Sequence, residues 1–383
     1  MSETGPEGGW TMARDAMRKF PSGLAGMLAL VVCVEAMISG HAQTLRNPWA
    51  WDWFLAEKAA RREVADSRVL CFGDSLMKFA VAPEALERSS GRKAYNLAVG
   101  VGQVPGSYFL LRRALESGAK PEAVVIDAIP HMLSARPDAN TTLWPELMTY
   151  RDCLELSWRS GDAQFFASTG LAKLLPSVRE RFEIRGVVTR ALNDQPSPVA
   201  DIIKAFVRNW TVNRGAQMTR RPAVTPPDQV AAWLPWILPE TWETTPLNAE
   251  YLRRFFALAR SRGIRAYWLL PPFDPAVQSL REVRGLDANY VAFIHSIQAE
   301  FPEVVVLDAR YCGYNTSEHI DPIHLDVRGA ASLSRDLGAI LRKDPASLAR
   351  WEMMPPFRDA SAEVALEDVD QSAEIIMRQK TIR

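Results

Sequence analysis

The chain has 383 residues, of which 48% are hydrophobic, and its 45 Lys and Arg residues balance 45 Asp and Glu residues. The zero net charge disfavours a basic nucleic-acid-binding protein, and the apolar content argues against global disorder. Four Cys residues without a C-x-x-C pair exclude a disulfide scaffold, a zinc ribbon and a thioredoxin motif. The length suits two domains, or one domain with a large insertion.

An apolar segment near the N-terminus departs from this average composition. Glu35 is the only charged residue within positions 23–40. Three basic residues precede the segment: Arg14, Arg18 and Lys19. Such a pattern is typical of a membrane-anchored or exported protein. We expect an uncleaved single-helix anchor, a cleaved signal peptide that yields a secreted protein, or a buried soluble helix. In the first two cases the body lies outside the cytoplasm, because positive residues stay inside.

Residues 43–66 are expected to form a juxtamembrane segment that leads into a helix-like stretch at 55–64. Trp49, Trp51 and Trp53 lie at its start. These rings either sit at the level of the lipid headgroups or dock on the folded domain.

Five short apolar stretches predict the strands of a sheet: residues 68–72, 94–99, 123–129, 264–270 and 304–307. Apolar residues at helical spacing predict helices at 103–117, 251–259 and 288–301, and a last helix that begins near Asp326. Strands that alternate with helices favour a parallel sheet covered by helices on both faces.

Residues 132–245 interrupt this alternation and are too long and too apolar for a plain loop. Helix-like pieces at 165–175 and 199–208 predict a mainly helical insertion or cap. The tail mixes charges with scattered apolar residues, so we expect it to be loosely attached or disordered. The predicted segments are therefore 1–22, 23–42, 43–66, 67–131, 132–245, 246–345 and 346–383.

Three residues at the predicted strand ends have the chemistry of a nucleophilic site. Ser75 follows the first strand, and Asp321 and His324 precede the last helix. Ligands of open parallel sheets bind at the carboxyl ends of the strands. A serine hydroxyl is a weak nucleophile unless an imidazole takes its proton, and a carboxylate fixes the tautomer of that imidazole. We predict that Ser75 is the nucleophile, His324 the base and Asp321 its orienting partner.

These motifs resemble the SGNH/GDSL hydrolase superfamily over residues 68–131 and 264–341. The G-D-S-L block stands here as Gly73-Asp74-Ser75-Leu76, the D-x-x-H block as Asp321-Pro322-Ile323-His324, and the glycine block is matched by Asn96, Gly100 and Gly102. The resemblance implies a flavodoxin-like three-layer α/β sandwich with a parallel sheet of about five strands. It also implies an acyl-enzyme on Ser75, an oxyanion hole formed by the amides of Ser75 and of Gly100 or Gly102, and no metal or organic cofactor.

The chain departs from the family at the third block, G-x-N-D, because no Asn follows the third predicted strand. This departure points to divergent members, including a membrane-associated polysaccharide O-acetyltransferase-like branch. Three functions stay open: an ester hydrolase, an O-acetyltransferase or deacetylase of an envelope polysaccharide, and a catalytically weak binding or scaffold protein. Asp74, Asn96 and His131 are possible pocket residues. The expected partners are a small-molecule or glycan ester and, through the N-terminal segment, a membrane, but no nucleic acid.

Several of these residues also have alternative interpretations. Gly100, Gly102 and Gly106 have a spacing that only approximates a dinucleotide-binding loop. His319 adds a third possible metal ligand to Asp321 and His324, but divalent sites need three or four ligands and no further cluster is evident. The arginines of the insertion form either a solvated face or a surface for anionic glycans or lipid headgroups.

Overall fold

The computed structural model describes residues 22–41, 45–194, 199–221, 235 and 237–381. The basic residues that precede the apolar segment, and the last residue of the predicted 23–42 segment, Ala42, therefore lie outside the described residues. The same is true of 222–234 and 236 within the predicted insertion.

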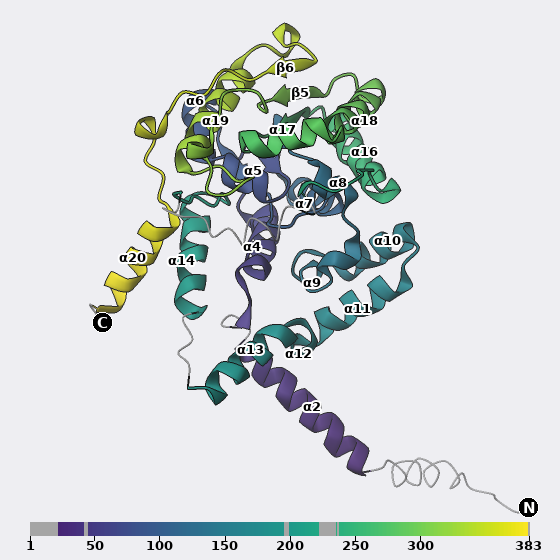
Figure 1. The fold of residues 1–383 in the computed structure, drawn as a ribbon. Coiled ribbons are helices and arrows are strands. Elements are labelled where there is room, and N and C mark those ends of the chain that lie inside the picture. Colours follow the sequence, from purple (N-terminus) through teal and green to yellow (C-terminus); the bar gives the residue numbers. More distant parts are fainter. Residues whose placement is uncertain (1–21, 42–44, 195–198, 222–234, 236, 382–383) are drawn as a thin grey trace, which may run out of the picture.

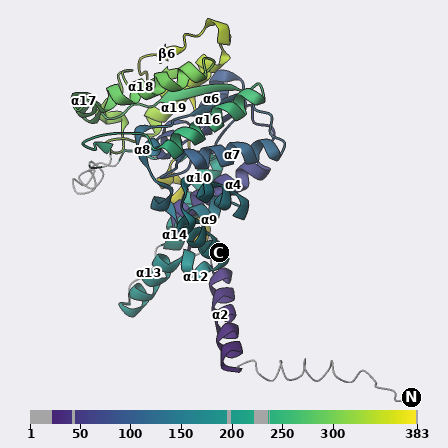
Figure 2. The same ribbon diagram turned by 90° about the vertical axis from the view of Figure 1, so that its right-hand side faces the viewer.

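A parallel sheet of six strands in the order β2-β1-β3-β4-β5-β6 organises the fold. The strands are β1 (Val69–Phe72), β2 (Ala94–Asn96), β3 (Ala123–Ile126), β4 (Arg265–Leu270), β5 (Val305–Asp308) and β6 (Trp351–Met353). Helices lie on both faces of the sheet, so the predicted α/β class is confirmed (Figures 1 and 2). The sheet has six strands, one more than the predicted number of about five.

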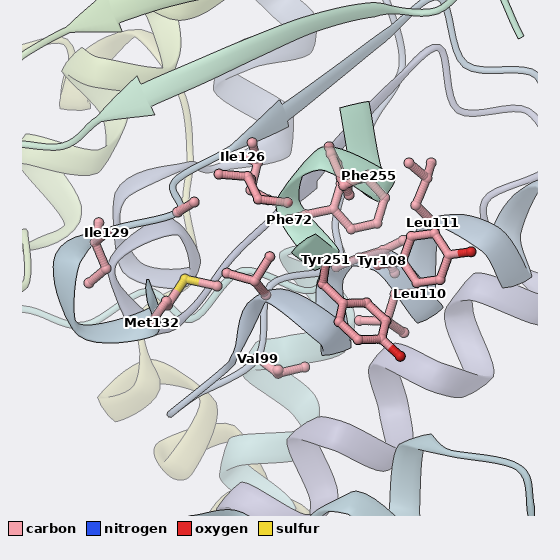
Figure 3. Close-up of a cluster of buried hydrophobic side chains, with 14 of the residues drawn as sticks. Phe72, Val99, Tyr108, Leu110, Leu111, Ile126, Ile129, Met132, Tyr251 and Phe255 are labelled. Atoms are coloured by element: carbon pink, nitrogen blue, oxygen red, sulfur yellow. The ribbon is translucent and has the colours of Figure 1, made fainter. Parts of the chain in front are cut away.

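Alternation along the strands builds a separate apolar core on each face. Phe72 and Ile126 point into a core completed by α7 (Val104–Glu116), α16 (Pro246–Ser261) and α18 (Leu286–Glu300). Figure 3 shows part of this core, in which the ring of Phe72 meets that of Phe255 edge to face at 5.3 Å.

The opposite face of the sheet carries the second core. Cys71 and Val125 pack there with side chains of three helices. These helices are α5 (Ser75–Ala80), α6 (Pro83–Ser90) and α19 (Val327–Arg342). Asp326 caps α19 by accepting from the amides of Arg328 and Gly329, so the predicted helix start is confirmed, although α19 is not the last helix because α20 follows it.

The sixth strand comes from the tail, which the sequence predicted to be loosely attached. The amide of Val306 donates to Arg350 and that of Met354 to Asp308, both over 2.9 Å. Further on, α20 (Val369–Thr381) packs against α14 (Val199–Val212). A strand of three residues at a sheet edge buries too little apolar surface to be visible as a pattern, which explains the wrong prediction.

The predicted juxtamembrane segment is part of the folded domain. α4 (Pro48–Arg62) begins at the N-cap Asn47 and buries one face, including Ala56 and Ala59. Trp53 is fully buried and donates from Nε1 to the Gly100 carbonyl over 2.9 Å. Of the two alternatives for the tryptophans, docking on the domain therefore holds for Trp53.

The predicted insertion is largely helical within its described residues. Its elements are α8 (Pro130–Ser134), a 3₁₀ turn (Pro137–Asn140), α9 (Trp144–Leu147), α10 (Tyr150–Ser160), α11 (Ala163–Leu174), α12 (Pro176–Arg179), α13 (Arg181–Leu192) and α14. Below them, α2 (Ser22–Gly40) projects from the body (Figure 1). Residues Gly23–Gly40 are long and apolar enough to cross a membrane, as both an anchor and a signal sequence would be.

A buried ion pair joins α4 to α5. The Nζ of Lys78 lies 2.7 Å from Oδ1 of Asp52, and both side chains are nearly inaccessible to solvent. Burial raises the pKa of Asp52 and lowers that of Lys78, while the opposite charge of the partner counters each effect. Asp52 also accepts from the Gly100 amide over 2.6 Å and from Trp210 Nε1 over 3.0 Å. Four separate segments therefore meet at one carboxylate.

Replacement of Lys78 by Met should destabilise the protein by about 3–5 kcal/mol, because Asp52 keeps a buried charge without a partner. The free energy of unfolding of the full chain in detergent, followed by Trp fluorescence, measures this. Arg253→Met removes an exposed pair with Glu300 and should cost less than about 1 kcal/mol. Equal losses in the two variants would contradict a special role of the buried pair.

Candidate active site

The nucleophile candidate lies at a sharp turn between β1 and α5. Gly73, at φ 147°, joins the strand to Asp74, and Asp74 caps the helix by accepting from the Leu76 amide over 2.8 Å. Ser75 is the first residue of α5. A Cβ atom on Gly73 would lie 1.7 Å from Oδ1 of Asp127, so only glycine fits this position.

Three predicted site residues form a continuous hydrogen-bond chain. The Nε2 of His324 lies 2.8 Å from Oγ of Ser75, although the two residues are 249 positions apart. On the other side of the ring, Nδ1 lies 2.7 Å from Oδ2 of Asp321. These distances are within the reach that a serine, a general base and an orienting carboxylate need.

The surroundings of Asp321 favour its ionised form, which an orienting carboxylate needs. Its Oδ1 accepts from the amides of Ile323 and His324, each over 2.9 Å. Burial opposes its ionisation, but the neighbouring His324 and these hydrogen bonds outweigh it and hold the pKa of Asp321 below its usual value. A carboxylate that stays ionised next to Nδ1 fixes a proton on Nδ1 and leaves Nε2 free to accept one.

A second carboxyl group, that of Asp127, stabilises the turn between β1 and α5 that holds Ser75. Asp127, directly after β3, accepts from the amide of Met77 over 2.7 Å and from that of Asp74 over 3.2 Å. Its side chain is also hydrogen-bonded to that of Asp74. Burial and the adjacent Asp74 raise the pKa of Asp127 well above its usual value, and burial raises that of Asp74 to about 6. Burial therefore favours the protonated form of both carboxyl groups over the charged form.

The predicted oxyanion hole is not formed by Gly100 and Gly102. The Gly100 amide donates to Asp52 over 2.6 Å, and the Gly102 amide donates to the Val99 carbonyl over 3.0 Å. Both glycines are instead needed for space, since a Cβ atom on either would lie less than 3.0 Å from a neighbouring ring or carbonyl.

Val101 lies between the two glycines in a left-handed conformation, at φ 49°, which is unfavourable for a β-branched residue. Its carbonyl accepts from Nδ2 of Asn140 over 2.8 Å. Within the described ranges, no acceptor is found for the amide of Val101 or for that of Ser75, and both residues line the same cavity. Backbone strain of this kind is concentrated at functional sites.

The cavity beside Ser75 has a volume of about 260 Å³ and a mostly apolar wall. Its apolar lining includes Trp49, Leu76, Val101, Ile129, Ile237, Trp242, Phe273, Leu286 and Ile323. Of the three predicted pocket residues, Asp74 and His131 line this cavity. Burial lowers the pKa of His131 to about 4, so its ring adds no charge to the wall near neutral pH.

Asn96, the third predicted pocket residue, has a structural role. Its Nδ2 donates to the carbonyls of Met77 and Val81, and its Oδ1 accepts from the amide of Ala98. The side chain is fully buried between β2 and α5 and does not line the cavity.

Sequence reasoning missed Asp127, Val101 and the aromatic wall formed by Trp49 and Trp242. Asp127 had a usable signal, because it follows a strand end as Ser75 does. Val101, Trp49 and Trp242 had no such signal in the sequence, since their role depends on contacts between distant segments. Across the described ranges, no group of three or more His, Cys, Asp or Glu side chains could hold an ion.

Comparison with known proteins adds no family assignment. No protein-family model matches the chain, and no curated protein sequence is similar to it. The functional interpretation therefore depends on the geometry of the site.

Asp127 variants test its support of the nucleophile turn. Asp127→Asn keeps one acceptor and should lose about 1–3 kcal/mol of unfolding free energy, because one buried amide is left unpaired. Asp127→Ala leaves both amides unpaired and should lose more. Urea denaturation of the full chain in detergent measures the unfolding free energy of each variant. An alanine variant as stable as the asparagine variant would contradict this account.

The raised pKa of Asp74 predicts a pH dependence of stability. The folded state binds this proton more tightly than the unfolded state, so unfolding free energy should fall as pH rises from about 4 to about 6. A pKa difference of about two corresponds to a few kcal/mol. Asp74→Asn keeps the helix cap and removes the titration. The difference between wild type and variant at pH 4 and pH 6 isolates the effect, and a constant difference would refute it.

Proposed function

We propose that this protein is a serine-dependent ester hydrolase that acts through an acyl-enzyme on Ser75, in the manner of the SGNH/GDSL superfamily. The observation that carries the proposal is the chain Ser75–His324–Asp321, with contacts of 2.8 and 2.7 Å. Its position beyond the carboxyl end of β1, in the wall of a cavity, gives a substrate access to the serine hydroxyl.

The chemistry follows from the orientation of the imidazole. His324 removes the proton from Oγ of Ser75 as the oxygen attacks the acyl carbonyl, and Asp321 stabilises the imidazolium that forms. The amides of Ser75 and Val101 receive the negative charge on the carbonyl oxygen. His324 then returns the proton to the leaving alcohol, and an activated water releases the acyl group from Ser75 in a second, equivalent cycle.

The cavity wall supports an ester with an apolar acyl group. Apolar side chains dominate the lining, and the ionisable residues in it are few: Asp74, His131, Arg281 and His324. Binding of a polysaccharide depends on many hydrogen-bonding side chains, and this wall offers few of them. Water as the acceptor, and hence hydrolysis, is favoured over transfer to a sugar.

We further propose that α2 anchors the enzyme in a membrane with the catalytic domain outside the cytoplasm. The support is the apolar helix at Gly23–Gly40, whose side chains make almost no contact with the body of the protein, together with the basic residues that precede it in the sequence.

Replacement of Ser75 by Ala tests the nucleophile. The full chain in detergent should hydrolyse p-nitrophenyl esters, and Ser75→Ala should lower the rate by at least about 10³-fold, because no other group can form the acyl-enzyme. A fluorophosphonate probe should label wild type at Ser75 and leave the variant unlabelled. Ser296→Ala, on the exposed side of α18, serves as the matched control and should retain both properties. Equal rates for wild type and Ser75→Ala would overturn the proposal.

A further inference from the structure

We infer that α11, α12 and α13 form a lipid-binding surface that lies in the outer face of the bilayer beside α2 and binds anionic phospholipids. This inference rests on the proposed anchor. It adds that the catalytic domain is held at the membrane by a second, extended contact rather than by a single helix.

The first observation concerns the one charge within α2. The carboxylate of Glu35 accepts from the amide of Ser177 in α12 over 3.0 Å and also from the Ser177 hydroxyl. An ionisable side chain in a membrane helix is costly unless it is paired. Glu35, which looks out of place in an anchor or a signal peptide, is therefore the group that joins α2 to α12.

The position of this contact along α2 gives the depth of Ser177 below the membrane surface. Glu35 precedes the last residue of α2, Gly40, by five positions, and a helix rises by about 1.5 Å per residue. If the helix ends at the membrane surface, Ser177 lies about 7.5 Å below it. Interfacial helices bury their apolar face about 5–10 Å into the boundary between headgroups and acyl chains. α12 thus lies at the depth expected for such a helix.

The second observation is the composition of the exposed surface around Ser177. Large apolar side chains are exposed along α11 and α13: Phe166, Leu171, Leu174, Phe182, Val187, Val188 and Leu192, with Leu174 at 67% and Leu192 at 81%. Exposed apolar surface of this extent marks an interaction site. Arg181 and Arg185 are exposed on α13 among these residues. Cations flanking an apolar face are typical of helices that bind anionic lipid.

The third observation favours a bilayer over a second copy or a protein partner. α12 and α13 lie beside the body-proximal end of α2 in both views (Figures 1 and 2). The exposed apolar residues of α11 and α13 thereby flank α12, the helix that contacts α2, and the side chains of α2 are almost all exposed. An occupant that covers α2 is lipid, and the adjacent surface meets the same occupant.

The lipid-binding surface is also tied to the catalytic core. Nδ2 of Asn47, the N-cap of α4, donates to Oε1 of Glu183 in α13 over 2.6 Å. Glu146 lies 3.1 Å from Nε of both Arg46 and Arg179. Because α4 carries Asp52 and lies against the loop of Gly100, the membrane contact fixes the orientation of the active-site cavity relative to the bilayer.

Site-specific fluorescence tests this surface in the full chain. The protein is reconstituted in vesicles of phosphatidylcholine and phosphatidylglycerol, in a Cys33→Ser background because Cys33 is the exposed native thiol. Leu174→Cys and Leu192→Cys place an NBD label on the lipid-binding surface. Val283→Cys in α17 (Pro275–Val283), 85% exposed in wild type, is the matched control. A label on native Cys33 reports whether α2 itself is in the membrane.

Labels at positions 174 and 192 should be quenched by phospholipids with a shallow doxyl group and at least about threefold less by aqueous iodide than the label at 283. Iodide quenching equal to that at 283, with Cys33 protected, overturns the lipid-binding surface and leaves the anchor intact. Protection that depends on protein concentration instead of on lipid assigns the surface to a second copy and also overturns it. An iodide-accessible Cys33 defeats the anchor as well. Ester hydrolysis, measured in the same vesicles, reports separately on the proposed reaction.

Discussion

The buried carboxylate of Asp52 is the contact on which the arrangement of the site depends. It binds Lys78 in the nucleophile helix, the Gly100 amide in the loop beside the cavity, and Trp210 in α14. Each partner comes from a different part of the chain, so none of these segments can shift without leaving a buried charge or donor unpaired. The segment that precedes the sheet thereby becomes part of the catalytic domain.

The pair Asp74 and Asp127 adds a second constraint around the nucleophile. The two carboxyl groups bind amides at the start of α5, and burial raises the pKa of both, which disfavours two negative charges beside Ser75. Asp127 also occupies the space that a side chain on Gly73 would need. The turn that holds Ser75 is therefore fixed on one side by the Asp127 carboxyl group. On its other side lies the apolar cavity, where electrostatic interactions of the Ser75–His324–Asp321 chain are poorly screened and therefore strong.

The anchor and the insertion have a common explanation. Glu35 disfavours a simple membrane helix, and the exposed apolar residues of α11 and α13 disfavour a simple soluble cap. The contact between Glu35 and Ser177 reconciles both, since it joins the two features at one depth.

The sequence alone determined the α/β class, the positions of five strands and the three residues that meet in the hydrogen-bond chain Ser75–His324–Asp321. Strand alternation, glycine at a strand end and the spacing of Asp321 and His324 are local patterns, and local patterns survive in a single sequence. Only the tertiary structure decided which amides keep no acceptor in the protein, because the amides of Gly100 and Gly102 donate to Asp52 and Val99. It also placed the tail in the sheet and α4 in the core. These outcomes depend on pairing between residues far apart in the chain, and no periodicity in the sequence records which distant partner a buried group will find.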